Sequence, residues 1–351
     1  MNTSNIVLSA KDKLNFFSNF ATMLSAGIPI LETMDALLEG SKGNQAKIFA
    51  AIREDLVQGK HLYEAMAKFP QAFDLVTVNI IKASEEAGTL ETTLRDIRVE
   101  IKKDMEFNDR VKSALTYPAI IMCVFLGVLL MILIVVVPKI STVFLRMKVE
   151  LPLATKVLIF VSQAILTYTI PILLGLVLLI VGGMFLYKSQ KKYINGFIFS
   201  LPLVEKLIKE IDLTRFSRSM YLLLTSGITI NGALDLCEHV VLRRDIARAI
   251  LHAKEVIMSG KKLSEGFIEQ KHIFSSIMIK IIEAGEKTGT LDKSMMEISE
   301  YLDYEVSNTL KTLTTLLEPL MLVFVGILVG GMMMAIIAPI YGLIGSVGSA
   351  H

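Results

Sequence analysis

Residues 283–291 have the composition of a phosphate-binding loop. They read EAGEKTGTL, with two glycines, a lysine and two threonines. A Walker A loop needs the spacing GxxxxGK[ST] after a strand, because its backbone N–H groups cradle phosphate and its lysine follows the second glycine. Here the two glycines are too close, and Thr290 follows the second. The related stretch ASEEAGTL at 83–90 has lost the first glycine and the lysine. The pattern therefore argues against a nucleotide site.

What the two stretches share is typical of a corner between two helices. The shared residues are Glu85 and Glu286, Gly88 and Gly289, Thr89 and Thr290, and Leu90 and Leu291. Glycine in the left-handed conformation closes one helix, and we expect the threonine hydroxyl to cap the next. Glu91 and Asp292 then fall in a first turn, where the helix dipole favours negative charge. The glutamates either support the corner by local hydrogen bonding or pairing, or contact a partner or a cation.

Other residues give little support for catalysis. The five histidines, His61, His239, His252, His272 and His351, lack metal-ligand spacing, and no GxSxG or CxxC motif is present. Cys123 and Cys237 are far apart and indicate two buried thiols. A net charge of +2 gives no basic field for nucleic acid. We expect no enzyme, no metal and no cofactor.

Three apolar stretches predict three transmembrane helices. Residues 119–137, 157–187 and 320–340 carry no charged side chain and are long enough to cross a bilayer. The N-terminus has no charged region followed by an apolar core, so we do not expect a cleaved signal peptide there. We expect the N-terminus in the cytoplasm and the uncharged C-terminal tail outside, although the positive-inside rule helps only weakly.

The chain also repeats itself. MLSAGI at 23–28 returns as LLTSGI at 223–228, Pro118 matches Pro319, and Pro138 matches Pro339. The offset is 200 residues for the first match and 201 for the later ones. Each copy reads as a polar domain of about six short helices followed by one apolar helix. Because two membrane crossings, the first and second spans, would separate the polar domains, we expect both domains on the same side of the membrane.

The predicted fold is an all-α integral membrane protein with two repeated six-helix cytoplasmic bundles and three transmembrane helices. The predicted segments are a first cytoplasmic domain at 1–112, a first span at 113–138, a short external loop at 139–156, a second span at 157–187, a second cytoplasmic domain at 188–311, a third span with its lead-in at 312–341, and an external tail at 342–351. Within the first domain, we expect Pro29 in the first turn of the second helix and Asn44 as the cap of the third.

Several motifs resemble those of the GspF/PilC family, the inner-membrane platform proteins of type IV pili and type II secretion systems. The motifs are AGIPI at 26–30, E-x-x-G-x-L at 85–90 and 286–291, LTYPAI at 115–120, VVPKI at 136–140, LP-x-x-T at 151–155 and RFSRSMYLLLTSGI at 215–228. The resemblance covers nearly the whole chain. Departures include Ser18, where the family tends to have the arginine that the second copy keeps as Arg218, and Ser84, where it often has the glycine kept as Gly285.

The resemblance implies a mechanical function in the bacterial inner membrane. A platform of this family couples a cytoplasmic hexameric assembly or retraction ATPase to polymerisation of pilins or pseudopilins. Its expected partners are that ATPase, the pilins, other inner-membrane machine components, the lipid bilayer and further copies of itself. The alternatives are a small-solute membrane transporter, which would need ionisable residues in its spans, and a membrane-anchored sensor, which would need an output domain.

Two roles stay open for Arg218, an internal ion pair or a contact to the ATPase. The residues that we single out as partner contacts or structural motifs are Gly27, Pro29, Glu85, Gly88, Leu90, Pro118, Arg218, Gly227, Glu286, Gly289, Leu291 and Pro319. The stretch GGMMM at 330–334 is a further candidate for contact with pilins or another copy, because glycines permit close helix approach.

Overall fold

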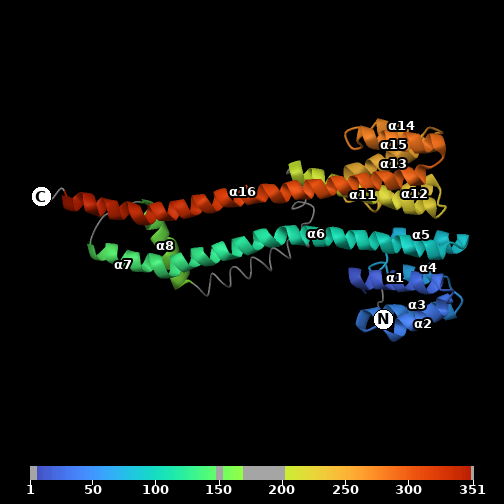
Figure 1. The fold of residues 1–351 in the computed structure, drawn as a ribbon, viewed down its shortest axis with the longest axis horizontal. Coiled ribbons are helices and arrows are strands. Elements are labelled where there is room, and N and C mark those ends of the chain that lie inside the picture. The colour runs from blue at the N-terminus through green and yellow to red at the C-terminus, as the bar shows by residue number, and fades with distance from the viewer. Residues whose placement is uncertain (1–5, 148–152, 169–201, 349–351) are drawn as a thin grey trace. The chain divides into compact units, whose positions relative to one another are not determined.

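The computed structural model describes residues 6–147, 153–168 and 202–348, and these form helices with no strand (Figure 1). The first six helices are α1 (Ala10–Ser25), α2 (Ile30–Glu39), α3 (Gly43–Val57), α4 (Leu62–Ala67), α5 (Leu75–Ala87) and α6 (Leu90–Met131). A π-helical turn, η2 (Ile132–Val136), α7 (Val137–Met147) and α8 (Leu153–Thr167) follow. The last six helices are α11 (Pro202–Thr225), α12 (Ile230–Glu238), α13 (Arg244–Met258), α14 (Leu263–Ile268), α15 (Ser276–Thr288) and α16 (Leu291–Gly348).

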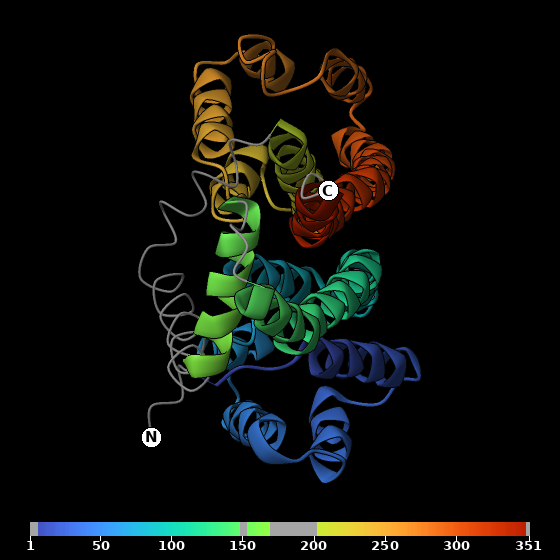
Figure 2. The ribbon, with the colours of Figure 1, turned by 90° about the vertical axis from the view of Figure 1, so that its left-hand side faces the viewer.

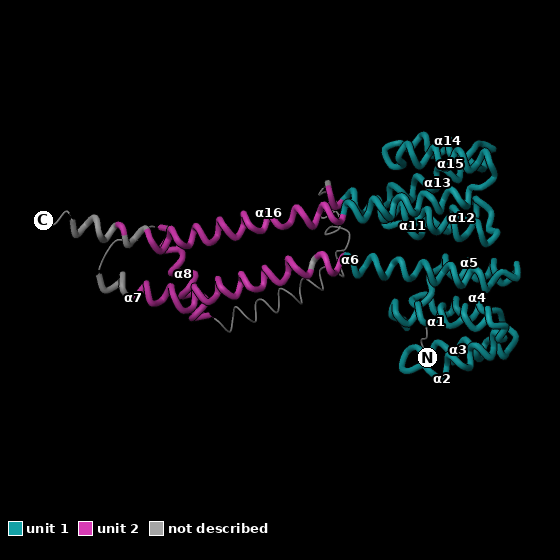
Figure 3. The backbone as a smooth tube through the Cα atoms, in the orientation of Figure 1, with its two compact units in different colours: residues 1–110, 205–309 teal, residues 111–204, 310–351 magenta. Residues whose placement is uncertain are grey.

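The chain divides into two compact units (Figure 3). Unit 1 consists of residues 1–110 and 205–309, and unit 2 consists of residues 111–204 and 310–351. We call the part of unit 1 from α1 to residue 110 the first helical set, and the part from residue 205 to residue 309 the second helical set. The helices of the two sets follow in the same order, and Figure 2 shows them in end view. The sixth helix of each set, α6 or α16, continues without a break into unit 2.

Local sequence explains where several helices begin. The side chains of Ser9, Asp74, Thr229 and Ser275 each accept a hydrogen bond from a backbone N–H in the first turn of the helix that follows. These bonds satisfy donors that a helix start leaves unpaired. Two predictions of helix starts were wrong by one or two positions. Pro29 is the residue before α2 rather than part of its first turn, and Lys42, not Asn44, precedes α3.

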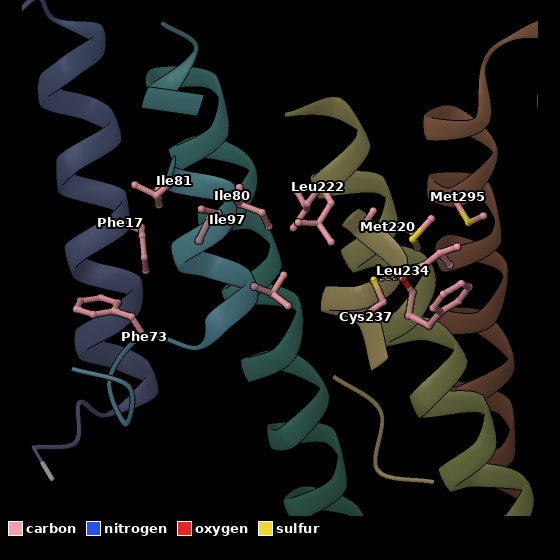
Figure 4. Packing of buried hydrophobic residues seen from close by; sticks show 14 of the residues in the cluster. Phe17, Phe73, Ile80, Ile81, Ile97, Met220, Leu222, Leu234, Cys237 and Met295 are labelled. Carbon is pink, nitrogen blue, oxygen red and sulfur yellow. Dashed lines mark hydrogen bonds between the residues drawn. The ribbon is translucent and has the colours of Figure 1, made fainter. Parts of the chain in front are cut away.

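The apolar core of unit 1 combines aliphatic and aromatic side chains, among them Phe17 and Phe73 (Figure 4). In the first helical set, Phe16 is fully buried and packs against Phe17, Phe20, Phe49 and Phe73. In the second set, the buried ring cluster is Phe216, Phe267 and Phe274. Aromatic side chains bury large areas each, so these clusters account for much of the hydrophobic stabilisation that holds α1 and α11 in their sets.

Within the described residues, two helices are long and apolar enough to cross a membrane. They cover 90–142 and 291–337, and only 11% and 17% of their most apolar stretches are buried. A core helix of a soluble protein would be mostly buried, so the outward-facing apolar side chains, such as Val124 and Leu322, favour contact with lipid.

The second predicted span falls only partly in the described residues. Its first eleven residues, 157–167, belong to α8, and 169–187 lie outside the described residues, as do 188–201 of the second predicted domain and the last residues of the tail. Within the predicted external loop at 139–156, α7 extends to Met147 and α8 begins at Leu153. Most of that segment is therefore helical.

Candidate functional site

The two E-x-x-G-x-L motifs form matching helix corners. Gly88 closes α5 with φ +71°, and Gly289 closes α15 with φ +72°. This left-handed conformation is strained for residues with a side chain, which is why glycine occupies it. The next N–H reaches back over the turn in both corners, from Thr89 to the Ser84 carbonyl at 2.8 Å and from Thr290 to the Gly285 carbonyl at 2.9 Å. The predicted left-handed glycines are confirmed.

The threonines of the corners do not cap the following helices through their hydroxyls. The Thr290 hydroxyl pairs with that of Thr288 at 2.7 Å. Within the described residues, no hydrogen bond joins the Thr89 hydroxyl to a backbone N–H of α6. The prediction of a hydroxyl cap was therefore wrong. Glu91 and Asp292 do lie in the first turns of α6 and α16, as expected.

The Glu85 carboxylate reaches a different helix from its own. It accepts hydrogen bonds from the backbone N–H groups of Leu62 at 3.1 Å and Tyr63 at 3.4 Å, and His61 Nδ1 lies 3.1 Å away. Leu62 and Tyr63 are the first residues of α4, so the carboxylate satisfies donors that this helix start leaves unpaired. It thereby holds α4 against α5.

Glu286 does the same in the second helical set. Its carboxylate accepts from the Leu263 N–H at 2.5 Å, from the Ser264 N–H at 3.2 Å and from the Ser264 hydroxyl at 2.5 Å. Hydrogen bonds to an ionised acceptor are roughly twice as strong as neutral ones. Each glutamate thus joins two helices within its own set, by bonds that span 22–24 residues rather than the corner itself. No group of three His, Cys, Asp or Glu residues in the described ranges could hold a metal ion.

Arg218 lies in a cluster of carboxylates in unit 1. Its side chain is 6% exposed, and the guanidinium donates to Glu100 at 2.8 Å, to Asp104 at 3.4 Å and to Asp303 at 2.5 Å. Nε also donates to the Ser299 hydroxyl at 3.3 Å. We call these five residues the Arg218 cluster. Glu100 and Asp104 come from α6, whereas Ser299 and Asp303 come from α16, so the arginine on α11 joins the two helical sets.

The electrostatics of this cluster reflect its burial and its excess of carboxylates. Burial raises the pKa of Glu100 to about 7, although the Arg218 charge opposes the shift. Burial also raises the pKa of Asp104. For Arg218 burial works toward a lower pKa, but the attraction of Glu100 and Asp303 outweighs it, and the arginine pKa is raised. An arginine with three acidic neighbours is thus held fully charged, which suits a structural ion-pair cluster.

Sequence reasoning identified Arg218 but not its partners. Glu100 and Asp104 are four residues apart, and so are Ser299 and Asp303. That spacing places each pair on one face of its helix. The spacing could have predicted that each pair lies on one helix face. It could not have predicted that both faces contact Arg218, because that depends on how the two helical sets pack.

The other predicted residues have structural places. Gly27 and Gly227 follow α1 and α11 with φ +81° and +83°. Leu90 and Leu291 are buried in the core of unit 1. Pro118 and Pro319 lie inside α6 and α16. None of them joins the Arg218 cluster or the hydrogen bonds of Glu85 and Glu286.

Comparison with known proteins places the chain among components of two related machines. The family model described as "Type II secretion system (T2SS), protein F" matches residues 16–138 and again 216–339, which together exceed half of the chain. The type IV pilus assembly protein PilC of Thermus thermophilus is 30% identical over 340 residues, covering 96% of this chain and 83% of that protein. PilC of Myxococcus xanthus is 28% identical over 97% of this chain and 82% of its own. The type II secretion system protein F of Pseudomonas aeruginosa is 27% identical over 96% and 84%.

Proposed function

Because the chain belongs to the family of type II secretion system protein F, we propose that it is the inner-membrane platform of a type IV pilus or type II secretion machine and couples a cytoplasmic ATPase to polymerisation of pilins or pseudopilins. The observation that carries the proposal is the double family match. Each matched segment contains a helical set and the apolar helix that continues from it. Relatives from both machines align along nearly the whole chain.

The proposed topology has three spans, with the N-terminus inside and the C-terminus outside. The apolar parts of α6 and α16 supply the first and third spans. The second runs from 157 to 187 and includes most of α8. With two crossings between the helical sets, both sets lie in the cytoplasm and offer paired docking surfaces to a ring-shaped motor.

The proposed membrane partners are pilins or further copies of the chain. Gly330 and Gly331 in α16 have open space where a side chain would begin, and Met333 and Met334 beside them are 54% and 75% exposed. Small residues let another helix approach closely in lipid. This face of α16 is therefore the best candidate for helix contacts between molecules.

A gene deletion tests the function directly. We expect the deletion strain to lose surface fibres in electron micrographs and a plasmid copy to restore them, if the machine is a pilus. If the machine is a secretion system, fibres stay and secreted proteins are lost from the medium. Both phenotypes unchanged would contradict the proposed function.

Matched cysteines test the topology in the same cells. Lys60 and Lys261 are exposed loop residues at corresponding places in the two helical sets. In a background without Cys123 and Cys237, we expect Lys60→Cys and Lys261→Cys to react with a membrane-impermeant maleimide only after the inner membrane is opened, whereas Ser346→Cys reacts in intact spheroplasts. Labelling of Lys261→Cys in intact spheroplasts would exclude the same-side arrangement.

A further inference from the structure

Two prolines at corresponding positions interrupt the backbone hydrogen bonds of unit 2. Pro138 lies in α7 and Pro339 lies in α16. Proline has no N–H, so the carbonyl that would accept its hydrogen bond receives none from the helix. Where the backbone is buried, water does not replace that bond, and an unsatisfied carbonyl costs free energy. Each proline therefore creates a demand for a donor from elsewhere.

The local helix type fixes which carbonyl each proline leaves unpaired. Around Pro339 the helix is α-helical, so the carbonyl is that of Ala335, four residues earlier. Before Pro138 the backbone is π-helical, and the Val137 N–H bonds the Ile132 carbonyl five residues earlier. By the same register, Pro138 leaves the carbonyl of Leu133 without a partner.

Both of these carbonyls accept a hydrogen bond from a hydroxyl of α8. Thr155 Oγ1 donates to the Ala335 carbonyl at 2.6 Å, and Ser162 Oγ donates to the Leu133 carbonyl at 2.5 Å. All four residues are buried in unit 2. Thr155 and Ser162 are seven residues apart, which is close to two full turns and places them on similar sides of α8. Figure 1 shows α8 between α7 and the C-terminal part of α16.

We propose that α8 is a polar clamp, in which Thr155 and Ser162 satisfy the two proline-freed carbonyls and thereby fix α16 and the η2–α7 segment to one helix. The two proline sites, one in each long apolar helix, are thus both bonded by α8, which has no counterpart in the repeat. The clamp also gives a physical reason for two motifs, VVPKI at 136–140 and the threonine of LP-x-x-T at 155. Both hydroxyls are positioning groups, and neither needs a partner protein to act.

A double-mutant cycle between Thr155 and Pro339 tests the clamp. Thr155→Val keeps the shape of the side chain and removes the donor, so the thermal midpoint of the full chain in detergent, followed by circular dichroism, should fall by roughly 1–3 °C. Pro339→Ala gives position 339 an N–H that can bond the Ala335 carbonyl. In that background Thr155→Val should lower the midpoint by less than half as much.

Two variants separate loss of the clamp from general damage. Thr155→Ser retains a hydroxyl and should behave like the unchanged protein. Thr142→Val removes an exposed hydroxyl of α7 that bonds the Lys139 carbonyl in its own helix, so it should have little effect. If Thr155→Val alone fails to fold, the Thr155→Val and Pro339→Ala double variant should still fold.

Local cross-linking provides a second measurement. Ile159 and Ile336 line the small cavity beside the Thr155 contact. With both replaced by cysteine and the native cysteines removed, mild oxidation should form the disulfide at least twofold more slowly in the Thr155→Val protein. An equal cost of Thr155→Val with and without Pro339, or an unchanged cross-linking rate, would overturn the proposal. Both measurements use purified protein, so they do not depend on which machine the chain serves.

Discussion

The first and second helical sets use one glutamate in the same way. Glu85 bonds the start of α4 and Glu286 bonds the start of α14, each through two backbone N–H groups. These bonds stay within one set, so each set needs its own. A contact that stabilises a single helical set is thus present in both sets.

The arginine position shows the opposite behaviour. In the second set Arg218 bonds Asp303 of α16, whereas the corresponding positions in the first set hold Ser18 and Lys102. Lys102 pairs with Glu106 on its own helix at 3.7 Å. Position 102 thus carries a positive charge where the second set has the Asp303 carboxylate. Because Arg218 bonds both sets, one such residue is enough to join them.

The residue before each glutamate, Gly285 in the second set and Ser84 in the first, differs in its steric surroundings. A side chain at Gly285 would begin 2.3 Å from the Ser294 hydroxyl oxygen, which is too close for any contact. In the first set Ser84 occupies this position, fully buried, and its hydroxyl donates to the Ile81 carbonyl at 2.9 Å. The two corners therefore share backbone geometry but pack their neighbouring helices differently.

The largest effect is expected from removing Arg218. Arg218→Ala leaves Glu100, Asp104 and Asp303 close together without a counter-charge, and breaking a buried pair in this way costs about 3 kcal/mol. Cys237 is buried in the same unit, so its rate of reaction with a thiol reagent under native conditions reports opening of unit 1. In a Cys123→Ala background, we expect that rate to rise on the order of a hundredfold.

Ser18→Ala is the matched control for the arginine. It changes the corresponding residue of the first set, whose hydroxyl makes no hydrogen bond in the described residues, and should leave the Cys237 rate within about twofold. Equal rates for Arg218→Ala and Ser18→Ala would show that the cluster does not hold the sets together.

The glutamates should rank next, and Glu286 should matter more than Glu85. Both lose two bonds to backbone N–H groups on replacement by alanine, which costs about 1–2 kcal/mol. Glu286→Ala also removes the bond from the Ser264 hydroxyl, while Glu85 is partly exposed beside His61. Hydrogen exchange of the Leu62 and Leu263 amides measures the two losses separately, and Glu86→Ala, an exposed neighbour, serves as the control. If Glu286→Ala accelerated exchange of the Leu263 amide less than Glu85→Ala accelerates exchange of the Leu62 amide, the ranking would be reversed.

Local features were predictable from the sequence because they depend on nearby residues. Gly88 and Gly289 take the left-handed conformation at the places where the motif put them. The helical nature of the chain and its long apolar helices follow from periodicity and from the absence of charge. Helix starts were less certain, since several residues near a boundary can serve, and Lys42 took the place expected for Asn44.

Contacts over long separations were not predictable in this way. The bonds of Glu85 reach α4 only because α4 and α5 pack side by side, and the sequence carries no sign of that pairing. Thr155 is separated from Ala335 by 180 residues. The sequence motifs included Pro138 and Thr155. Only the structure shows that hydroxyls of α8 bond carbonyls that the prolines leave without a helical N–H partner.

The smallest effect concerns the pH dependence of the Arg218 cluster. The pKa of Glu100 is about 7 in the folded chain, against an ordinary value of 4.5. Between these values the folded form binds more protons than the unfolded form, so stability falls as the pH rises. Asp104, whose pKa is also raised, acts in the same direction, while Arg218 and Arg215 attract its ionised form. We expect unit 1 to lose about 1 kcal/mol between about pH 6 and pH 7 through Glu100.

Glu100→Gln should remove that part of the pH dependence, because the amide keeps the shape of the side chain and does not titrate. The readout is hydrogen exchange of buried amides of unit 1 at the two pH values, corrected for the intrinsic rate at each. Glu106→Gln, an exposed residue on the same helix, should keep the slope of the unchanged protein. If the pH dependence of stability survived in Glu100→Gln, it would belong to another group. Protonation of Glu100 would then not stabilise unit 1, despite the excess of carboxylates around Arg218.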